Sequence, residues 1–221
     1  MENLLAAPDA DAETPVHRVR LIEGMVAAVD EKGYAATTIA DIVRHARVSK
    51  RTFYEQFADR EECFLACFSY GSELALAAVK LAADTALPWR QRVRDSTHAY
   101  LAALEGNPAL TRTLLVEVHA VGPRALALRR TVLERFAALL CELVEQGRQC
   151  HPELRPLRPA MSIALVGGIN ELVLSTVEHG GTGRLHELAD TVAELVEAVL
   201  SPLPEPPGPA PAPCASSPPS S

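Results

Sequence analysis

The sequence has no pair of cysteines at CxxC spacing, and its five cysteines form an odd number. A disulfide framework and a zinc site are therefore both disfavoured, and we expect no metal. No run of about 18 uninterrupted apolar residues occurs, so a membrane span is not expected. The N-terminal stretch MENLLAAPDADAETP is acidic and has no basic region before an apolar run. This argues against a signal peptide and makes the cytoplasm the expected location.

Signatures of catalysis are also missing. The sequence contains no nucleophile elbow, phosphate-binding loop or metal-ligand cluster, and its serines lack an accompanying base. We therefore expect neither an enzyme nor a bound cofactor.

Proline is absent between Pro15 and Pro88, which leaves room for several uninterrupted helices. It is abundant at the end, where nine of the last twenty residues are proline. Such a tail is typical of a disordered or polyproline-like extension. Hydrophobic periodicity predicts an all-α chain without strands. We expect about nine helices, over residues 16–32, 38–46, 49–55, 60–84, 89–105, 108–120, 123–149, 159–179 and 185–200.

Acidity is uneven along the chain, whose formal net charge is −7. Residues 1–15 carry four acidic residues and no Lys or Arg, and residues 61–221 carry eighteen acidic against thirteen basic residues. Only residues 16–60 have a positive balance, with eight basic and six acidic residues. An acidic chain with one basic segment is attracted weakly to DNA in general and keeps one focused contact face.

That basic segment contains two short helical patterns joined by a turn, in YAATTIADIVRHARVSKRTFYEQFADR over residues 34–60. Thr38 and Asp41 form a start that resembles a capping box. One apolar stripe follows at helical spacing, formed by Ile39, Ile42, Val43 and Ala46. These features predict a short first helix that ends before Val48.

Ser49 is a good N-cap for a second short helix. A short helix needs tertiary support, and Phe53 and Phe57 supply it if they pack with Val48 on the first helix. The polar residues of the second helix then remain exposed near its N-terminus. That end enters the major groove in helix-turn-helix proteins.

Asp59 and Glu62 repeat the capping pattern and start a third helix, with Arg60 at its first position. A cation there opposes the helix dipole. We interpret this as a sign that Arg60 faces a phosphate, with a solvated arginine as the alternative.

Residues 18 to about 65 resemble the tetracycline-repressor-like (TetR) family of transcriptional regulators. The resemblance rests on Gly33-Tyr34, Thr37-Thr38, Asp41-Ile42, Ala46, Val48-Ser49-Lys50, Thr52-Phe53-Tyr54, Phe57 and Arg60-Glu61. It implies a helix-turn-helix DNA-binding domain over 16–60 and a helical ligand-binding and dimerisation domain over 61–200. We expect residues 1–15 to form a disordered arm and residues 201–221 a disordered tail. The resemblance also implies a homodimeric repressor that a small-molecule effector releases from a palindromic operator in double-stranded DNA.

By position, the resemblance implies DNA contacts from Thr38, Arg47, Lys50, Arg51, Thr52, Tyr54, Gln56 and Arg60. We expect Lys50 and Tyr54 to hold phosphates and Arg51 and Thr52 to lie near base edges. Arg47 replaces the glycine that the family usually has in the turn. If the position needs a positive φ, arginine there costs on the order of 1 kcal/mol. Arg51 and Gln56 also depart from the family pattern, so the resemblance does not predict the operator sequence.

The C-terminal helices are apolar on more than one side, as in MSIALVGGINELVL over residues 161–174. A helix of that kind contacts both the core and a second partner, and the resemblance makes the partner a second subunit. We expect the dimer interface to include Met161, Leu165, Gly168, Leu172, Leu188, Val192, Leu195 and Val199. A monomer with an internal helical hairpin is the alternative.

We expect a ligand pocket among the helices of residues 89–150 and 159–179, with polar lining from Trp89, Tyr100, Glu117, His119 and Asn170. The run WRQRVRD, residues 89–95, is interpreted as a solvated helix face. A ligand that favours one tilt of the helix over 60–84 would change the spacing of the two DNA readers.

Two other functions stay open. One is a helical adaptor or ligand-binding protein without DNA binding. The other is a thiol-responsive regulator of the same fold that uses Cys63 and Cys67, which would need an exposed thiol of low pKa.

Overall fold

The computed structural model describes residues 10–83 and 86–202, and within these ranges the chain forms helices and no strand. The expected all-α fold is confirmed. Helix α1, Ala10–Ala36, begins earlier than expected, so residues 10–15 are helical rather than part of an arm. The rest of the predicted arm, residues 1–9, and residues 203–221 of the predicted tail lie outside the described residues.

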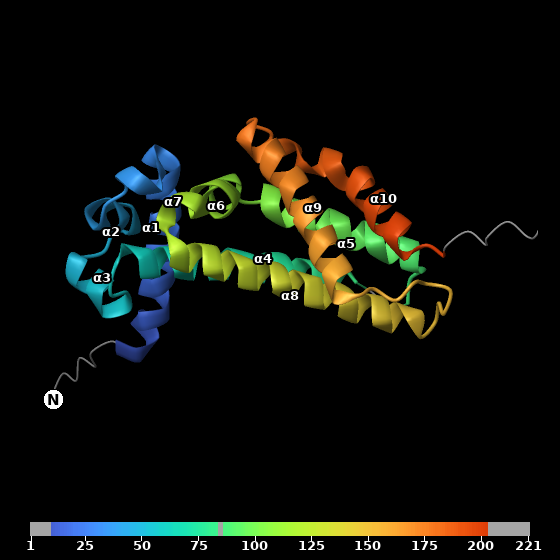
Figure 1. Cartoon of the computed structure of the whole chain (residues 1–221). Helices are drawn as coiled ribbons and strands as arrows, with labels where there is room; N and C mark the ends of the chain where they lie inside the picture. Colours follow the sequence, from blue (N-terminus) through green and yellow to red (C-terminus); the bar gives the residue numbers. More distant parts are fainter. Residues whose placement is uncertain (1–9, 84–85, 203–221) are drawn as a thin grey trace, which may run out of the picture.

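Three helices form one end of the molecule (Figure 1). They are α1, α2 at Ile39–Ala46 and α3 at Lys50–Gln56. Gly24 brings α1 and α2 together, because a Cβ at this position would lie 2.6 Å from the carbonyl oxygen of Ile42. Only a glycine permits this approach, which places α2 and α3 across the middle of α1.

Helix α4, Arg60–Ala82, leads from this domain into the body, which continues with α5 at Trp89–Glu105. The single helix expected over 108–120 is divided into three parts. They are α6 at Pro108–Arg112, a π-helical turn η1 at Thr113–Glu117, and α7 at Val118–Val121. A π-helical turn inserts an extra residue into the helical repeat, so it changes the direction in which the following side chains point.

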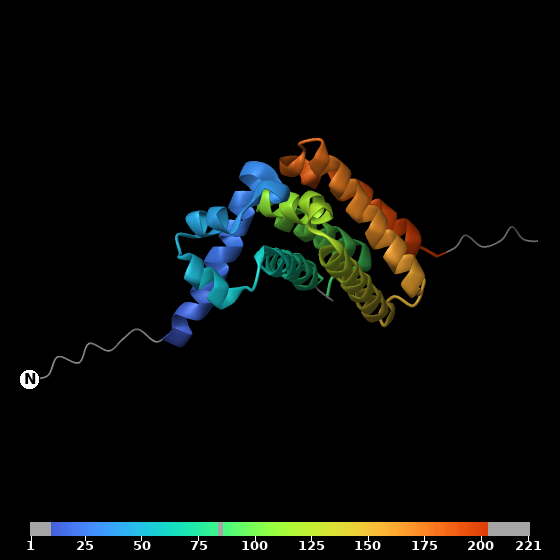
Figure 2. The ribbon, with the colours of Figure 1, turned by 60° about the vertical axis from the view of Figure 1, so that its left-hand side comes forward.

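The rest of the body consists of α8 at Pro123–Arg148, α9 at Pro159–Glu178, a 3₁₀ helix η2 at Thr182–Leu188, and α10 at Ala189–Leu200. Helices α9 and α10 lie on the side of the body that is away from α4, as the two views agree (Figure 2).

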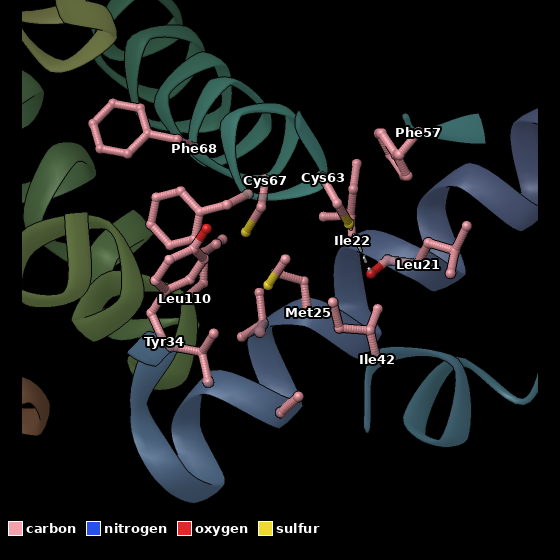
Figure 3. Packing of buried hydrophobic residues seen from close by; sticks show 14 of the residues in the cluster. Leu21, Ile22, Met25, Tyr34, Ile42, Phe57, Cys63, Cys67, Phe68 and Leu110 are labelled. Atoms are coloured by element: carbon pink, nitrogen blue, oxygen red, sulfur yellow. Dashed lines mark hydrogen bonds between the residues drawn. The ribbon is translucent and has the colours of Figure 1, made fainter. Parts of the chain in front are cut away.

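The largest core cluster joins the N-terminal helices to the start of α4 (Figure 3). Phe53, Phe57 and Phe64 are almost fully buried in it, and Tyr34 packs edge-on against Phe64 with ring centroids 5.1 Å apart. Two smaller clusters hold the body together. The first domain and the first turns of α4 therefore form one packed unit.

Helices α4 and α9 are long and apolar enough to cross a membrane by length and composition alone, which the absence of a long unbroken apolar run did not anticipate. In α4 the apolar side chains include the buried core residues Phe64, Cys67 and Phe68. Core helices of soluble proteins meet the same criterion, so these two helices are weak grounds for a membrane location.

Candidate nucleic-acid interface and internal cavity

Helices α2 and α3 both begin with the predicted caps. Thr38 and Asp41 form a reciprocal capping box at the start of α2, and Ser49 accepts a hydrogen bond from the backbone N–H of Thr52 at the start of α3. Lys32 lies 2.6 Å from the Asp41 carboxylate. Its hydrogen bond, followed by those from Thr38, lowers the pKa of Asp41 well below its usual range. Asp41 therefore stays ionised and holds the start of α2 in place.

Arg47 ends α2 in the left-handed conformation, with φ 54° and ψ 44°. Within the described residues it is the one non-glycine position with a positive φ. The turn therefore does need a positive φ at this position, and Arg47 carries backbone strain of the order of 1–2 kcal/mol.

The aromatic residues Phe53 and Phe57 anchor α3 to the core of the domain. Phe53 and Phe57 are buried, Val48 packs against the same cluster, and Tyr54 remains 59% exposed. Lys50 and Arg51 are exposed on the outer side of the helix. Arg51 pairs with Glu55 at 2.9 Å, but its side chain is 90% exposed and the pair is therefore weak.

The cations of this domain divide into two groups. Those beside the α1–α2 contact have protein partners, such as Lys32 with Asp41 and Arg44 with Glu31. Arg47 and Lys50, at the turn and at the start of α3, form no ion pair with any described residue. Arg20 of α1 is also exposed without an ion pair to a described residue, so two of the three cations of residues 16–60 that have no protein partner lie at the turn and the start of α3.

Arg60 has a different environment from the expected one. Its Nη1 donates hydrogen bonds to the carbonyl oxygens of Tyr34, at 3.0 Å, and Thr37. Its guanidinium also lies 4.2 Å from the centroid of the Tyr34 ring. The cation at the start of α4 thus satisfies carbonyls at the end of α1, where a positive charge is favourable. These contacts give Arg60 a structural role and account for it without a phosphate.

The other predicted contact residues have mixed roles. Thr38 is exposed but engaged in its capping box, while Thr52 and Gln56 are half-buried. Sequence reasoning missed Arg18, whose Nη1 donates to the carbonyl oxygen of Gln56 at 3.2 Å and whose guanidinium lies 4.4 Å from the centroid of the Phe57 ring. Its only sequence signal was its place in the basic segment, because its partners lie almost forty residues away.

A polar junction links the first domain to the body. Gly33 breaks the end of α1 with φ 77°, and the next backbone N–H, that of Tyr34, donates to Glu117 Oε2 at 2.8 Å. Glu117 ends the π-helical turn η1 and lies 3.8 Å from Arg112. Glu117 was predicted to line a ligand pocket, and this is corrected: the π-helical turn directs its carboxylate to α1.

The body contains an elongated cavity of about 190 Å³ between α4, α5, α8, α9 and α10. Trp89, Tyr100 and Asn170 line it, as the sequence predicted, whereas the exposed His119 does not. Leu114 and Leu115 of η1 and Phe68 of α4 also form part of the wall. Burial raises the pKa of Tyr100 to about 12, so this hydroxyl stays protonated.

The run of residues 89–95 is not a uniformly solvated face. Arg90 and Arg94 are exposed and lie beside Glu197 of α10, Arg94 at 3.5 Å. Arg92 points to the other side of α5, is only 8% exposed and lines the cavity. Its Nε is buried without a hydrogen-bond partner among the described residues.

The predicted dimer residues fall into two sets. Leu165 and Val192 are buried inside the body, so they belong to its core rather than to an outer surface. Met161, Gly168 and Leu195 are exposed, while Leu172, Leu188 and Val199 are half-buried. Ile163, at 50% exposure, was not predicted and adds to the apolar surface of α9.

The two cysteines of the thiol hypothesis are buried in the main core (Figure 3). Burial raises the pKa of the Cys63 thiol, and it raises the pKa of Cys67 to about 12. Cys63 Sγ also lies 3.8 Å from the carbonyl oxygen of Leu21, to which it donates. A thiol sensor needs an accessible thiolate, so this environment argues against that function.

Comparisons with known proteins agree with this geometry. Residues 21–67 match the sequence model of the bacterial regulatory proteins of the tetR family. No curated protein sequence matches the chain closely enough to count as a relative.

Several solved structures share the fold. FadR from Bacillus subtilis, a transcriptional regulator in complex with stearoyl-CoA, has a TM-score of 0.71 at 16% identity and covers 82% of this chain and 98% of its own. The fatty acid degradation regulator FadR from Bacillus halodurans has a TM-score of 0.73 at 18% identity, over 81% and 94%. PfmR from Thermus thermophilus, a TetR family transcriptional regulator, has a TM-score of 0.59 at 24% identity, over 86% and 98%.

Fold and site define a helix-turn-helix protein with a second helical domain that encloses an apolar cavity. The match over residues 21–67 identifies the N-terminal domain as one of the tetR type, and the whole chain shares the fold of the transcriptional regulators compared above.

Proposed function

We propose that the protein is a cytoplasmic homodimer that represses transcription from a palindromic DNA site and is released by a small-molecule effector. The observation that carries this proposal is the distribution of cations around α3. Arg47 and Lys50 lack described acidic partners, and Arg51 and Tyr54 are exposed beside them. Cations without protein partners on one exposed helix suit the phosphates on either side of a major groove.

The proposed contacts follow from these environments. Lys50, Arg47 and Tyr54 hold phosphates, and Arg51 and Thr52 lie near base edges. Arg51 exchanges its weak pair with Glu55 for a base when DNA binds. Thr38, Gln56 and Arg60 make smaller contributions, because their side chains or backbone carbonyls already have partners within the domain.

The proposed dimer face consists of the outward sides of α9 and α10. Small residues follow one another along the outer side of α9, and larger exposed apolar side chains flank them; the face comprises Ala160, Met161, Ile163, Ala164, Gly168 and Leu195. Nothing lies within 4 Å of a Cβ built on Gly168, so a second helix has room to approach closely. Two subunits joined by a twofold axis present two copies of α3, which suits a palindromic site.

Regulation is proposed to pass from the cavity to the first domain along two routes. Phe68 of α4 lines the cavity and also belongs to the N-terminal core. Leu114 and Leu115 of η1 line the cavity, while Glu117 of the same turn holds the N–H of Tyr34. A ligand that favours one position of α4 and η1 needs a differential binding free energy of only about 1.4 kcal/mol to change DNA affinity tenfold.

DNA binding is tested by selecting genomic fragments with the purified protein and measuring the affinity for the selected duplex by fluorescence anisotropy. Lys50→Ala should weaken binding to all sequences and reduce the slope of log affinity against log salt by about one. Lys80→Ala, an exposed lysine at the far end of α4, is the matched control and should change neither. If no duplex is selected, the protein is a helical ligand-binding or adaptor protein instead.

The dimer face is tested by sedimentation at micromolar concentration. Ala164→Glu should give monomers, because it places a charge at the centre of the proposed contact. Ala77→Glu, which adds the same charge to an exposed position on α4, should leave the dimer intact. A wild-type protein that sediments as a monomer would contradict the proposed assembly.

A further inference from the structure

The cavity wall carries positive charge and no negative charge. Arg92 and Arg129 are the two charged side chains among the described residues that line it, and no Asp or Glu does so. Arg92 is more than nine-tenths buried, whereas Arg129 is half-buried. The guanidinium of Arg92 has no ion pair or hydrogen bond with a described residue, and its Nε is out of reach of solvent.

A buried charge without a partner destabilises a folded protein, so such a group is kept only where something compensates for it. None of the described residues forms a compensating contact with Arg92. A Cβ built on Gly147 would lie 3.4 Å from Nη1 of Arg92, so the guanidinium lies beside the backbone of α8. Nε is the one guanidinium nitrogen of Arg92 that is buried without a partner among the described residues, and the residue lines the cavity, so its Nη groups can take a partner from there.

The other residues of the cavity wall indicate the chemistry of the rest of the ligand. It consists mainly of leucine, valine, alanine and phenylalanine side chains. Along α8 the wall extends from Arg129 to Gly147, a distance of about 27 Å at a rise of about 1.5 Å per residue. The lined surface is therefore elongated and mainly apolar, with Arg92 near Gly147 and Arg129 towards the other end of α8, which suits a long apolar chain that carries an anionic group.

We propose that the effector is an amphipathic anion with a long apolar chain, whose carboxylate is held by the buried guanidinium of Arg92. This rests on the proposed function, because it names the ligand that the effector cavity takes. The planar fork of arginine matches the two oxygens of a carboxylate. The enclosed position of Arg92 favours a compact head group over a bulky one.

The same chain chemistry occurs in free fatty acids and in acyl thioesters of coenzyme A, such as the stearoyl-CoA bound to FadR from Bacillus subtilis. Three probes separate the sources: stearate, uncharged stearyl alcohol and stearoyl-CoA. Trp89 lines the cavity three residues before Arg92 and is the one tryptophan of the sequence. Its fluorescence reports occupancy directly, and titration calorimetry provides an independent affinity.

The test uses the full chain and three variants. Arg92→Met should weaken stearate binding by about ten- to hundredfold, the usual worth of hydrogen bonds to a charged group. It should leave stearyl alcohol binding unchanged. Arg130→Met removes an exposed arginine of α8 that does not line the cavity and should change neither affinity. Without ligand, Arg92→Met should melt at a higher temperature than the wild type, which loss of a merely structural arginine would not produce.

Equal stearate affinity in the wild type and Arg92→Met overturns the proposal, and so does the absence of stearate binding. Loss of binding in Arg129→Met alone would place the head group at the opposite end and also overturn it. Tight binding of stearoyl-CoA that is insensitive to Arg92→Met would assign the cavity to the thioester. DNA affinity without ligand is measured in parallel, so that failure of the proposed function is seen separately from failure to bind stearate.

Discussion

The first domain and the body differ in how completely their polar groups are paired. In the first domain the starts of α2 and α3 are capped, most charges beside the core have partners, and the aromatic residues other than Tyr54 are buried. Three buried polar side-chain atoms lack hydrogen-bond partners among the described residues: one is in Glu61, at the first turn of α4, and two are in the body, in Arg92 and Glu197. The body also contains the cavity and the π-helical turn.

This difference suits a first domain with fixed geometry and a body whose structure responds to a ligand. A domain that positions side chains on DNA needs fixed geometry, which a satisfied and close-packed core provides. A domain that responds to a ligand needs groups that gain partners when the ligand arrives, and Arg92 in the cavity wall is such a group.

The largest effect is expected for the core cysteines. At neutral pH, Cys67, with a pKa of about 12, should react with a thiol reagent about a thousandfold more slowly than an ordinary thiol of pKa about 8.5. The exposed Cys150 is the internal control and should be modified first. Peptide mass spectrometry after brief labelling distinguishes the sites, and rapid labelling of Cys67 would mean that the first domain opens easily.

The same pKa shift predicts how stability depends on pH. The folded protein retains the Cys67 proton up to about pH 12, whereas the unfolded chain loses it near about pH 8.5. The resulting stabilisation is therefore complete below about pH 8.5 and is lost progressively above it. Urea unfolding at a series of alkaline pH values should show this decline, and Cys67→Ala should reduce it.

The next effect concerns packing. Phe53→Ala should lower the free energy of unfolding by about 3–5 kcal/mol, because the side chain is fully buried and the surrounding helices leave little room for collapse. Leu140→Ala, at a half-buried position of the cavity wall, should cost clearly less, since this side chain already borders empty space. Urea denaturation of both variants compares the two domains directly, and equal losses would contradict the contrast between them.

Much of the first domain could be predicted because its signals are local. The caps Thr38, Ser49 and Asp59 each bond to a backbone N–H three residues ahead. The aromatic support of α3 likewise follows from residue spacing. The intramolecular contacts of Arg60 could not be predicted, because its partners, the carbonyls of Tyr34 and Thr37, are more than twenty residues away and no local pattern shows them.

The body was less predictable, for two physical reasons. Nothing in the sequence of residues 108–120 marks the π-helical turn, which depends on packing and redirects Glu117 from the cavity to α1. Arg92 could have been separated from Arg90 and Arg94, because at 100° per residue it lies on the opposite side of α5. Residue spacing alone does not tell which side of α5 is buried, because that depends on how the helix packs against the rest of the body.

A smaller effect is expected at the junction between the domains. Glu117→Ala leaves the N–H of Tyr34 without its acceptor, which should cost about 1–3 kcal/mol of stability. It should also reduce the change in DNA affinity that a bound effector produces. Glu117→Gln keeps an acceptor oxygen and is the matched control. Thermal unfolding and anisotropy with and without stearate measure the two effects, and an unchanged response in Glu117→Ala would remove η1 from the regulatory route.

The smallest effect is expected at Arg47, where the rigid domain contains its own strained position. Arg47→Gly should raise the free energy of unfolding by about 1 kcal/mol, because glycine adopts a positive φ without the clash of a Cβ. It should also weaken DNA binding and reduce the salt slope by about one, since a phosphate contact is lost. Arg47→Ala removes the same cation but keeps the Cβ, so it should lose DNA affinity equally without becoming more stable. If both variants have the same stability, the left-handed turn carries no strain, and the domain then tolerates arginine there at no cost.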